Sequence, residues 1–475
     1  MRLRDSIKYN ICTMASVSVI KSSRGCDLLV VEKFQFCRQD VLKSGEVRWR
    51  CIKKNLRCVA KLYTIGAEYT VTRSELIHNH EPDETTLERK IVTTSCKRKA
   101  EEDISEQPSK IIKSVLSKHL PENLSSTDIN LIRKNVYNSR RKLLPALPKN
   151  INDVHSILDS FGPKTTTGEN FLFINSAVDN IIVFSCQTNI TTLCKMKDLY
   201  MDGTFSYCTK YFCQLFTIHG LENGHYVPLL YCLLPNKISD TYSRLFLLVK
   251  SKIFELFNIV FEPNEVFVDF EMAIHMALKV AFPKTKLNGC RFHLHQAWYR
   301  KIKSLGLTQM YKDKTCEESK WLTHTFGLTY LHPSEVEDCF IFDLMSYKPN
   351  HDLVDKYADY LLENYITPDS HFPPNIWAYE NPSIQRTTNA CESFHSKFNS
   401  SFYSCHPSIF IFIEKLKECQ IDAYLKIKSL HIPAKIKDKQ VKNKLKFIEN
   451  MVNMLRSGNI SRISFVKSVS HQNNF

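Results

Sequence analysis

Two cysteines and two histidines lie close together near the start of the chain, among short apolar runs typical of β-strands. Six residues separate Cys51 from Cys58, and nineteen more precede His78, which is followed two positions later by His80. Two thiolates and two imidazoles are a donor set that suits tetrahedral Zn²⁺. Because a unit of about sixty residues has a small core, a structural metal would help it to fold. The spacing therefore predicts a β-rich zinc finger over residues 22–83, the alternative being a β-rich module with incidental cysteines and histidines.

The segment after the finger, residues 84–125, differs from it in composition. Charged residues, Ser, Thr and Pro dominate, as in CKRKAEEDISEQPSK, and such a composition is typical of a linker. Within it, Lys97-Arg98-Lys99 could be a nuclear import signal or simply a solvated run of charge. The next segment, residues 126–195, is predicted to be a lead-in region that begins with a capped basic helix and continues into strands.

From residue 171 onward the pattern becomes that of an α/β domain. Three antiparallel-looking strands are followed by a helix, a strand, a helix and a strand. We place the core of this domain at residues 196–400, with a mostly helical insertion at about 296–385. Residues 401–475 are predicted to form a basic helical C-terminal region with a Lys-rich tail.

Three acidic residues stand out by their positions at or near the ends of predicted elements. Asp202 follows an apolar and aromatic run in LYMDGTF, Asp269 ends the strand VFVDF, and Glu392 lies on a predicted helix in TTNACESFHSKF. A carboxylate at the end of a buried strand is costly unless a cation pairs with it. Two strand acids and one helix acid could hold two divalent ions for phosphodiester chemistry. For each acid taken alone, the alternative is a cap or a surface ion pair.

The net charge of the chain indicates which class of molecule it binds. The formal net charge is +15 and the isoelectric point lies near 9.0. Neutralising phosphates releases counterions, so this charge favours nucleic acid as the partner, the alternative being a merely basic soluble protein. The sequence has no uninterrupted apolar run long enough for a transmembrane helix, and its basic N-terminus lacks the apolar region of a signal peptide. We therefore expect no membrane partner, and we expect most of the 17 cysteines to be reduced thiols of an intracellular protein.

Ordered motifs in the sequence resemble two known families. DGTF, QLFTIHG, LLP-x-K, VDFE-x-A, GCRFHLHQA and TNACESFH resemble, in this order, the Mutator-like element (MULE) transposases, and the resemblance runs from about residue 126 to 400. Residues 22–83 resemble the FLYWCH-type zinc finger through SSRG, Leu28-Leu29, Phe36, Trp49 and the terminal HNH, with Phe36 where that family usually has Tyr. A FLYWCH finger ahead of such a core is a known pairing in the transposase family.

The resemblance implies an α/β ribonuclease H-like core and a DDE-type transposase. It places Asp202 on the first core strand, Asp269 on the fourth and Glu392 on the final core helix, as the carboxylates that bind two Mg²⁺ or Mn²⁺ ions. The implied reaction is cut-and-paste transposition, in which water and then a DNA 3′-hydroxyl attack phosphodiester bonds. Two departures from the family pattern are Ala390, where a second Asn is common, and Leu199-Tyr200, where a Trp commonly precedes the DG pair.

The same resemblance implies the partners and the compartment. These are double-stranded DNA, especially transposon terminal repeats, further copies of the chain in a homo-oligomer on that DNA, and the nucleus. Basic residues of the finger would supply phosphate contacts. The candidates are Arg48, Arg50, Lys53, Lys54, Arg57 and Lys61.

The roles of three further residues stay open at the level of sequence. Cys290 and His293 form the family's Cys-x2-His motif, and they could position DNA or the insertion, bind a metal, or be a buried thiol and a hydrogen-bonded imidazole at a strand end. His395 lies three residues after Glu392 on the same helical face. It could hydrogen-bond the active site or simply cap the core.

Two other functions fit the same sequence. A domesticated, transposase-derived transcriptional regulator would keep the fold and the DNA binding without catalytic activity. A host nuclease of the same fold is the third interpretation. The intact set of three acids favours the enzyme, because a protein that only binds DNA has no need of carboxylates near phosphates.

Overall fold

The computed structural model describes residues 17–22, 25–118, 121–379, 389–434 and 439–471. The chain divides into two compact units, Met1–Ala146 and Leu147–Phe475, each with most of its residue contacts inside itself. Among the described helices, none has the length and apolar character that crossing a membrane requires.

The first unit opens with a six-stranded antiparallel sheet in which every strand pairs with its neighbour in sequence. Gly45 and Gly66 take positive φ angles of 83° and 75° in two of the tight turns between strands, a conformation that glycine adopts without strain. Trp49 is buried at the centre, and its Nε1 donates a hydrogen bond to Thr64 Oγ1 at 2.9 Å. The predicted β-rich finger is therefore present. Its strands are β1 (Ser18–Lys21), β2 (Asp27–Val31), β3 (Phe34–Val41), β4 (Val47–Cys51), β5 (Lys61–Ile65) and β6 (Thr70–Glu75).

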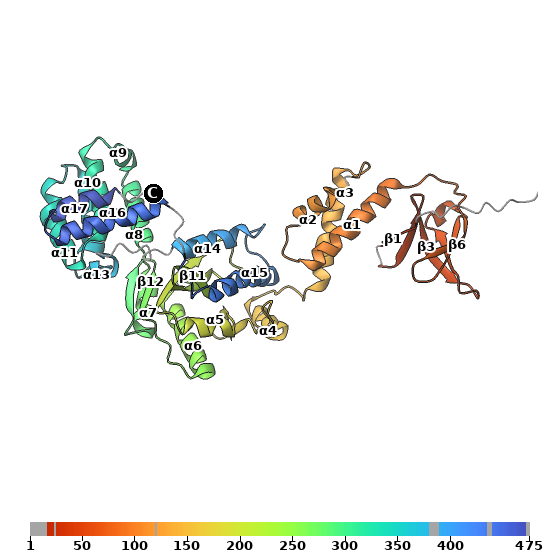
Figure 1. The fold of residues 1–475 in the computed structure, drawn as a ribbon, viewed down its shortest axis with the longest axis horizontal. Coiled ribbons are helices and arrows are strands. Elements are labelled where there is room, and N and C mark those ends of the chain that lie inside the picture. The colour runs from red at the N-terminus through yellow and green to blue at the C-terminus, as the bar shows by residue number, and fades with distance from the viewer. Residues whose placement is uncertain (1–16, 23–24, 119–120, 380–388, 435–438, 472–475) are drawn as a thin grey trace, which may run out of the picture. The chain divides into compact units, whose positions relative to one another are not determined.

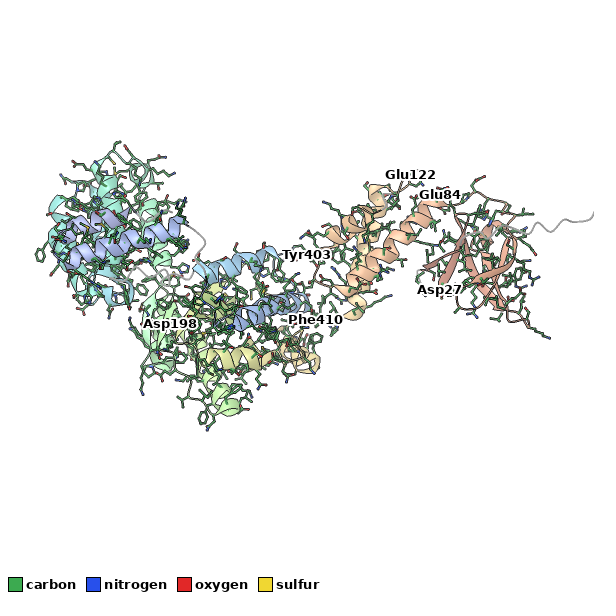
Figure 2. The ribbon with its side chains drawn as sticks, in the orientation of Figure 1. Asp27, Glu84, Glu122, Asp198, Tyr403 and Phe410 are labelled. Carbon is green, nitrogen blue, oxygen red and sulfur yellow. The ribbon has the colours of Figure 1, made fainter. Side chains whose placement is uncertain are left out.

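The segment expected to be a linker, residues 84–125, is instead largely helical (Figure 2). Val92, Cys96 and Ala100 recur every four residues and are buried against the two neighbouring helices. This narrow apolar stripe is hidden in a charged composition, which explains why composition alone indicated a linker. The expectation of an irregular linker is corrected accordingly. The helices are α1 (Glu84–Glu102), α2 (Pro108–Leu116) and the predicted basic helix α3 (Ser126–Leu143).

The second unit is built on a seven-stranded sheet of order β13-β12-β9-β10-β11-β8-β7 (Figure 1). The three central strands β9, β10 and β11 form an antiparallel meander, whereas β12 runs parallel to β9, and β13 runs parallel to β12. A parallel neighbour requires a crossover, which α6 supplies before β12 and α7 before β13. The strands are β7 (Leu172–Ser176), β8 (Ile181–Phe184), β9 (Asp198–Thr204), β10 (Gln214–Glu222), β11 (His225–Leu234), β12 (Glu265–Val268) and β13 (Lys286–Gly289).

Helices cover both faces of this sheet, and alternation along β9 shows which face each side chain meets. Leu199 and Met201 belong to the large apolar core that includes α6 and α7. Tyr200, between them, points to the other face and packs with Cys391 of α14. Asp202 continues this alternation on the α14 face. The helices are α4 (Ile151–Phe161), α5 (Gln187–Leu193), α6 (Ser239–Phe257), α7 (Met272–Ala281), α14 (Asn389–Ser400) and α15 (Ile409–Lys428).

The stretch between β13 and α14 is helical, as expected for the insertion, and it forms a second apolar core. Trp298, Trp321 and Trp377 are buried in it together with Val466 from the C-terminal helices. A Cβ on Gly327 would lie 2.2 Å from the carbonyl oxygen of Val466, so this contact requires glycine. The helices are α8 (Arg291–Ser304), α9 (Thr308–Lys312), α10 (Glu317–Thr325), α11 (Pro333–Asp338), α12 (Asp352–Leu361), α13 (Pro374–Trp377), α16 (Lys439–Arg456) and α17 (Arg462–Ser470).

Candidate zinc and catalytic sites

The four predicted zinc ligands converge at one end of the finger sheet. Cys51 ends β4, Cys58 follows a short 3-10 turn, and His78 and His80 follow β6. Their ligand atoms all lie within 4.8 Å of one another. Cys51 Sγ is 3.3 Å from His80 Nε2, and Cys58 Sγ is 3.4 Å from His78 Nδ1. Tetrahedral zinc with ordinary bond lengths has sulfur–nitrogen edges of about 3.5 Å, so the geometry matches.

The protonation chemistry of the finger site also fits Zn²⁺. Burial raises the pKa of the Cys51 thiol, so a thiolate at this position needs a cation beside it. Burial, followed by the charge of His80, lowers the pKa of His78, which favours the neutral imidazole that binds metals. Phe34 stacks on the His78 ring at 3.6 Å and holds it in place. The donor set therefore fits a structural Zn²⁺ ion.

The predicted catalytic acids come from three elements and line one pocket of about 680 Å³. β9 and β12 are parallel neighbours in a register that pairs Tyr200 with Phe267. Asp202 lies two residues after Tyr200, and Asp269 lies two residues after Phe267. The two aspartates therefore lie side by side at the carboxyl ends of these strands. Glu392 reaches the same pocket from α14. The structure thus brings together three residues that are far apart in the sequence.

Each of the two aspartates is fixed by the backbone amide that follows it. Gly203 N–H donates to Asp202 Oδ1 at 2.8 Å, and Phe270 N–H donates to Asp269 Oδ1 at 2.6 Å. A Cβ on Gly203 would lie 2.4 Å from Gln214 Oε1, the end of a side chain that would have to shift. The DG pair of the sequence motif therefore combines a pocket carboxylate with a glycine that packs against the Gln214 side chain of β10.

Two histidines contact the carboxylates. His293, on the first turn of α8, lies between Asp269 and Glu392, with Nδ1 3.6 Å from Asp269 Oδ1 and Nε2 2.9 Å from Glu392 Oε1. His395 Nδ1 lies 3.2 Å from Asp202 Oδ2. Burial opposes the charge on His293, but hydrogen bonds with Cys290 and Glu392 and the charge of Asp269 together raise its pKa to about 11.

These contacts bear on the three residues whose roles the sequence left open. His293 and His395 both touch carboxylates of the pocket, so neither is only a core residue. Cys290 is fully buried at the N-cap of α8 and hydrogen-bonds with His293. Across the described parts of the chain, the finger residues form the one group of three or more such ligands whose atoms converge within 4.8 Å, and the pocket acids do not meet this spacing.

Two basic side chains also line the pocket, and their role was not predicted from the sequence. These are Lys237, from the segment after β11, and Arg300, from α8, and Glu271 and Gln296 line the same pocket. Lys237 is the Lys of the LLP-x-K motif, which is the signal that could have identified it. A lysine and an arginine that line an acidic pocket suit a polyanion such as the phosphodiester backbone of DNA.

The six predicted DNA-contacting residues of the finger differ in their surroundings. Arg48 forms a bidentate ion pair with Asp40. Lys53 pairs with Asp83 at 2.8 Å, and Lys61 lies 3.8 Å from Glu75. Arg50 is half-buried, and Lys54 and Arg57 are exposed on the turn before Cys58. Of the six, Lys54 and Arg57 are therefore the most accessible to a phosphate.

Comparison with known families agrees with this geometry. Residues 199–297 match the model of the MULE transposase domain, a stretch that runs from β9 into α8 and includes Asp202, Asp269 and His293. Residues 19–80 match the model of the FLYWCH zinc finger domain, which includes all four zinc ligands. No curated protein matches the chain. The chain therefore combines a FLYWCH zinc finger domain with a MULE transposase domain, as the resemblance in its sequence implied.

Proposed function

We propose that this chain is a DNA transposase that cleaves phosphodiester bonds at transposon ends and joins the released strands to new DNA. Its transposase-family origin is supported by the MULE domain. We further propose that the core is ribonuclease H-like. The assignment is supported by three antiparallel strands followed in the chain by two parallel ones, with the spatial order β13-β12-β9-β10-β11. It is also supported by the acids, because Asp202 lies on the first of these strands in the chain, β9, and Asp269 directly follows the fourth, β12.

The observation that carries the proposal is the meeting of Asp202, Asp269 and Glu392 in one pocket. In this role the three carboxylates would hold two Mg²⁺ or Mn²⁺ ions, which supply activation of the attacking oxygen and stabilisation of the leaving oxygen. Carboxylates are the ligands that both ions prefer. The Asp202 side chain is only 11% exposed and that of Asp269 is 49% exposed. Asp202 would therefore bind metal inside the site, whereas Asp269 would face the DNA strand that enters it.

The remaining residues of the pocket would hold the substrate. Lys237 and Arg300, which line the pocket, would bind phosphates of the substrate. His293, paired with Asp269 and Glu392, would hold these two carboxylates apart by a fixed distance. The finger, together with the basic helix α3, would bind the terminal repeats, and two copies of the chain would act on a pair of transposon ends. We also propose that the protein acts in the nucleus.

The test is a strand-cleavage assay with DNA that carries the inverted repeats flanking the coding region. We expect the zinc-loaded protein to cleave this DNA when Mg²⁺ or Mn²⁺ is added, and we expect no cleavage when neither ion is present. Specific binding to the same DNA without cleavage under either ion would overturn the enzyme proposal and support a domesticated DNA-binding regulator. Cleavage of every DNA without preference for the repeats would support a host nuclease.

A further inference from the structure

A chain of polar side chains leads from Asp202 into the interior between β10 and α14. β10 carries Thr217 and His219, two residues apart on one face, and α14 carries His395 above them. His219 Nε2 is 2.9 Å from Thr217 Oγ1, and Thr217 Oγ1 is 2.8 Å from His395 Nε2. The other nitrogen of His395, Nδ1, is 3.2 Å from Asp202 Oδ2. The four residues therefore form one continuous path.

All three residues that follow Asp202 in this path are buried, at 0% exposed for Thr217, 1% for His219 and 5% for His395. Polar groups at this depth are held by their hydrogen-bond partners, because water does not replace a lost partner. Burial lowers the pKa of His219 well below its usual value, so this imidazole is neutral.

The contacts are compatible with a consistent arrangement of protons. If Nδ1 of His395 carries a proton and donates to Asp202, and Nε2 carries none, Nε2 is an acceptor. The hydroxyl of Thr217 then donates to that nitrogen, and its oxygen accepts from Nε2–H of His219. In this arrangement each of the three contacts is a hydrogen bond, and His395 is the Nδ1–H tautomer.

We propose that His219, Thr217 and His395 are positioning residues that fix the carboxylate of Asp202 for binding a divalent cation. This inference rests on the proposed function and assigns its supporting residues. His395 holds Oδ2 while the Gly203 amide holds Oδ1 at 2.8 Å, so the plane of the carboxylate is set from two sides. Partners of this kind orient metal-binding carboxylates and are costly to remove.

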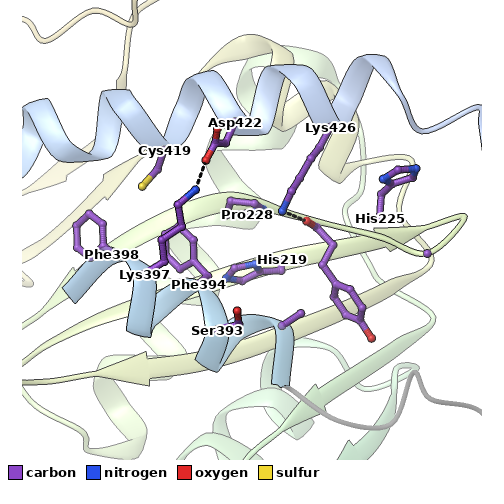
Figure 3. A pocket seen from close by; sticks show the side chains of 13 residues that line it. His219, His225, Pro228, Ser393, Phe394, Lys397, Phe398, Cys419, Asp422 and Lys426 are labelled. Atoms are coloured by element: carbon purple, nitrogen blue, oxygen red, sulfur yellow. Dashed lines mark hydrogen bonds and ion pairs between the residues drawn. The ribbon is translucent and has the colours of Figure 1, made fainter. Parts of the chain in front are cut away.

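The far end of the path is also anchored. The His219 ring meets Phe394 edge to face, with centroids 5.2 Å apart, and it reaches a second pocket of about 340 Å³ (Figure 3). Ser393 and Lys397 of α14 line this pocket together with His219. Phe394 and His395 are adjacent on α14, so the helix that would present Glu392 to the cations also contacts both ends of the path.

The test compares three variants of the zinc-loaded full chain. Thr217→Val removes the hydroxyl at nearly constant volume, Thr217→Ser keeps it, and Thr325→Val is a matched control. Thr325 is equally buried and hydrogen-bonded, but it lies in the insertion core. Nitrogen chemical shifts of isotope-labelled histidine report the tautomer of His395, whose signal is assigned by its loss in His395→Gln. Calorimetry reports Mn²⁺ binding independently of cleavage.

We expect Thr217→Val to shift the Nε2 signal of His395, which loses the hydroxyl beside it, and to weaken Mn²⁺ binding about 10-fold, whereas Thr217→Ser and Thr325→Val stay within about 2-fold of the wild type. An unchanged Nε2 signal and unchanged Mn²⁺ affinity in Thr217→Val would overturn the inference. If the Nε2 signal depends on Thr217 but the wild type binds no Mn²⁺, the hydrogen-bond path is supported and the proposed nuclease function fails.

Discussion

Asp269 is the most exposed of the three pocket carboxylates, and it has no buried chain of partners comparable to that of Asp202. Its oxygen accepts one backbone hydrogen bond and faces His293 at 3.6 Å. A residue with so few structural contacts can be changed with little effect on folding. This makes Asp269 the best single position at which to separate catalysis from DNA binding.

We predict that Asp269→Asn lowers the cleavage rate by about 100-fold or more, because an amide is a poor ligand where a carboxylate is needed. DNA affinity should be unchanged or slightly higher, since one negative charge near the phosphates is removed. Cleavage and equilibrium binding are measured on the same DNA. Asp240→Asn is the control, because Asp240 is an exposed acid that pairs with Arg244 on α6. Undiminished cleavage in Asp269→Asn would remove Asp269 from the active site.

The identity of the candidate acids could be predicted from sequence, but their neighbours could not. Asp202 and Asp269 each stand in a short local motif at the end of an apolar run, and such patterns are visible without a structure. The contact of His293 with Glu392 depends instead on how α8 and α14 approach each other across the whole insertion. No local pattern encodes that approach, so the sequence left the role of His293 open.

At the scale of elements, α1 is joined to the finger by its N-cap. The Asp83 side chain accepts a hydrogen bond from Thr86 N–H at 3.1 Å and pairs with Lys53 at 2.8 Å. The hydrogen bond from Lys53, the largest influence, and those from Thr86 lower the pKa of Asp83 to about 2. The folded pKa is thus below the ordinary value of 3.8, so this stabilisation is present above about pH 4 and is lost as the pH falls toward 2.

We predict that Asp83→Ala lowers the stability of α1 by about 1 kcal/mol at neutral pH and has little effect near pH 2. Hydrogen exchange of the α1 amides measures this directly. Glu102→Ala at the other end of the helix is the control, because Glu102 is exposed and lies 3.8 Å from Arg98 in a solvent-facing ion pair. Equal destabilisation by both substitutions would contradict the capping role of Asp83.

The finger should depend on its metal. Cys51 and Cys58 belong to the same small apolar cluster as Trp49, so loss of zinc removes both the cross-link and part of the core. We predict that chelation, or Cys51→Ser, unfolds residues 22–83 and frays the start of α1, because Leu87 packs with strand residues of the finger. The sheet of the second unit should stay folded. Dispersed finger resonances that survive chelation in an NMR spectrum would show that zinc is not structural.

The strands were easier to predict than the segments between them. Alternation along Val47–Cys51 and long apolar runs such as His225–Leu234 are strong local signals. The helix at Glu84–Glu102 was missed, because its buried stripe is formed by small or isolated residues such as Ala100 and Cys96 among charges. Its stability comes from packing on α2 and α3, which composition does not reveal.

At the scale of the whole molecule, the insertion and the C-terminal helices share one core although α14 and α15 separate them in the sequence. Val466 and Val469 of α17 pack with Trp321 and Phe326 of the insertion. The sequence predicted both regions as helical but gave no reason to join them. Such a long-range contact is determined by shape complementarity, as at Gly327, and not by periodicity.

The final prediction concerns DNA binding by the full chain, whose net charge is +15. Because phosphate contacts release counterions, we expect affinity for any DNA to fall by about 100-fold or more between 50 and 200 mM salt. Lys54→Ala combined with Arg57→Ala should reduce the slope of this salt dependence by about 2, since these are the two most accessible basic candidates of the finger. Removing residues 1–83 should reduce affinity for the terminal repeats more than affinity for unrelated DNA, because the remaining basic surfaces contact the backbone without reading bases. Fluorescence anisotropy on both DNAs across a salt series measures these effects. Equal loss on the two DNAs would show that the finger binds without preference, or binds a protein, and that the ends are recognised elsewhere in the chain.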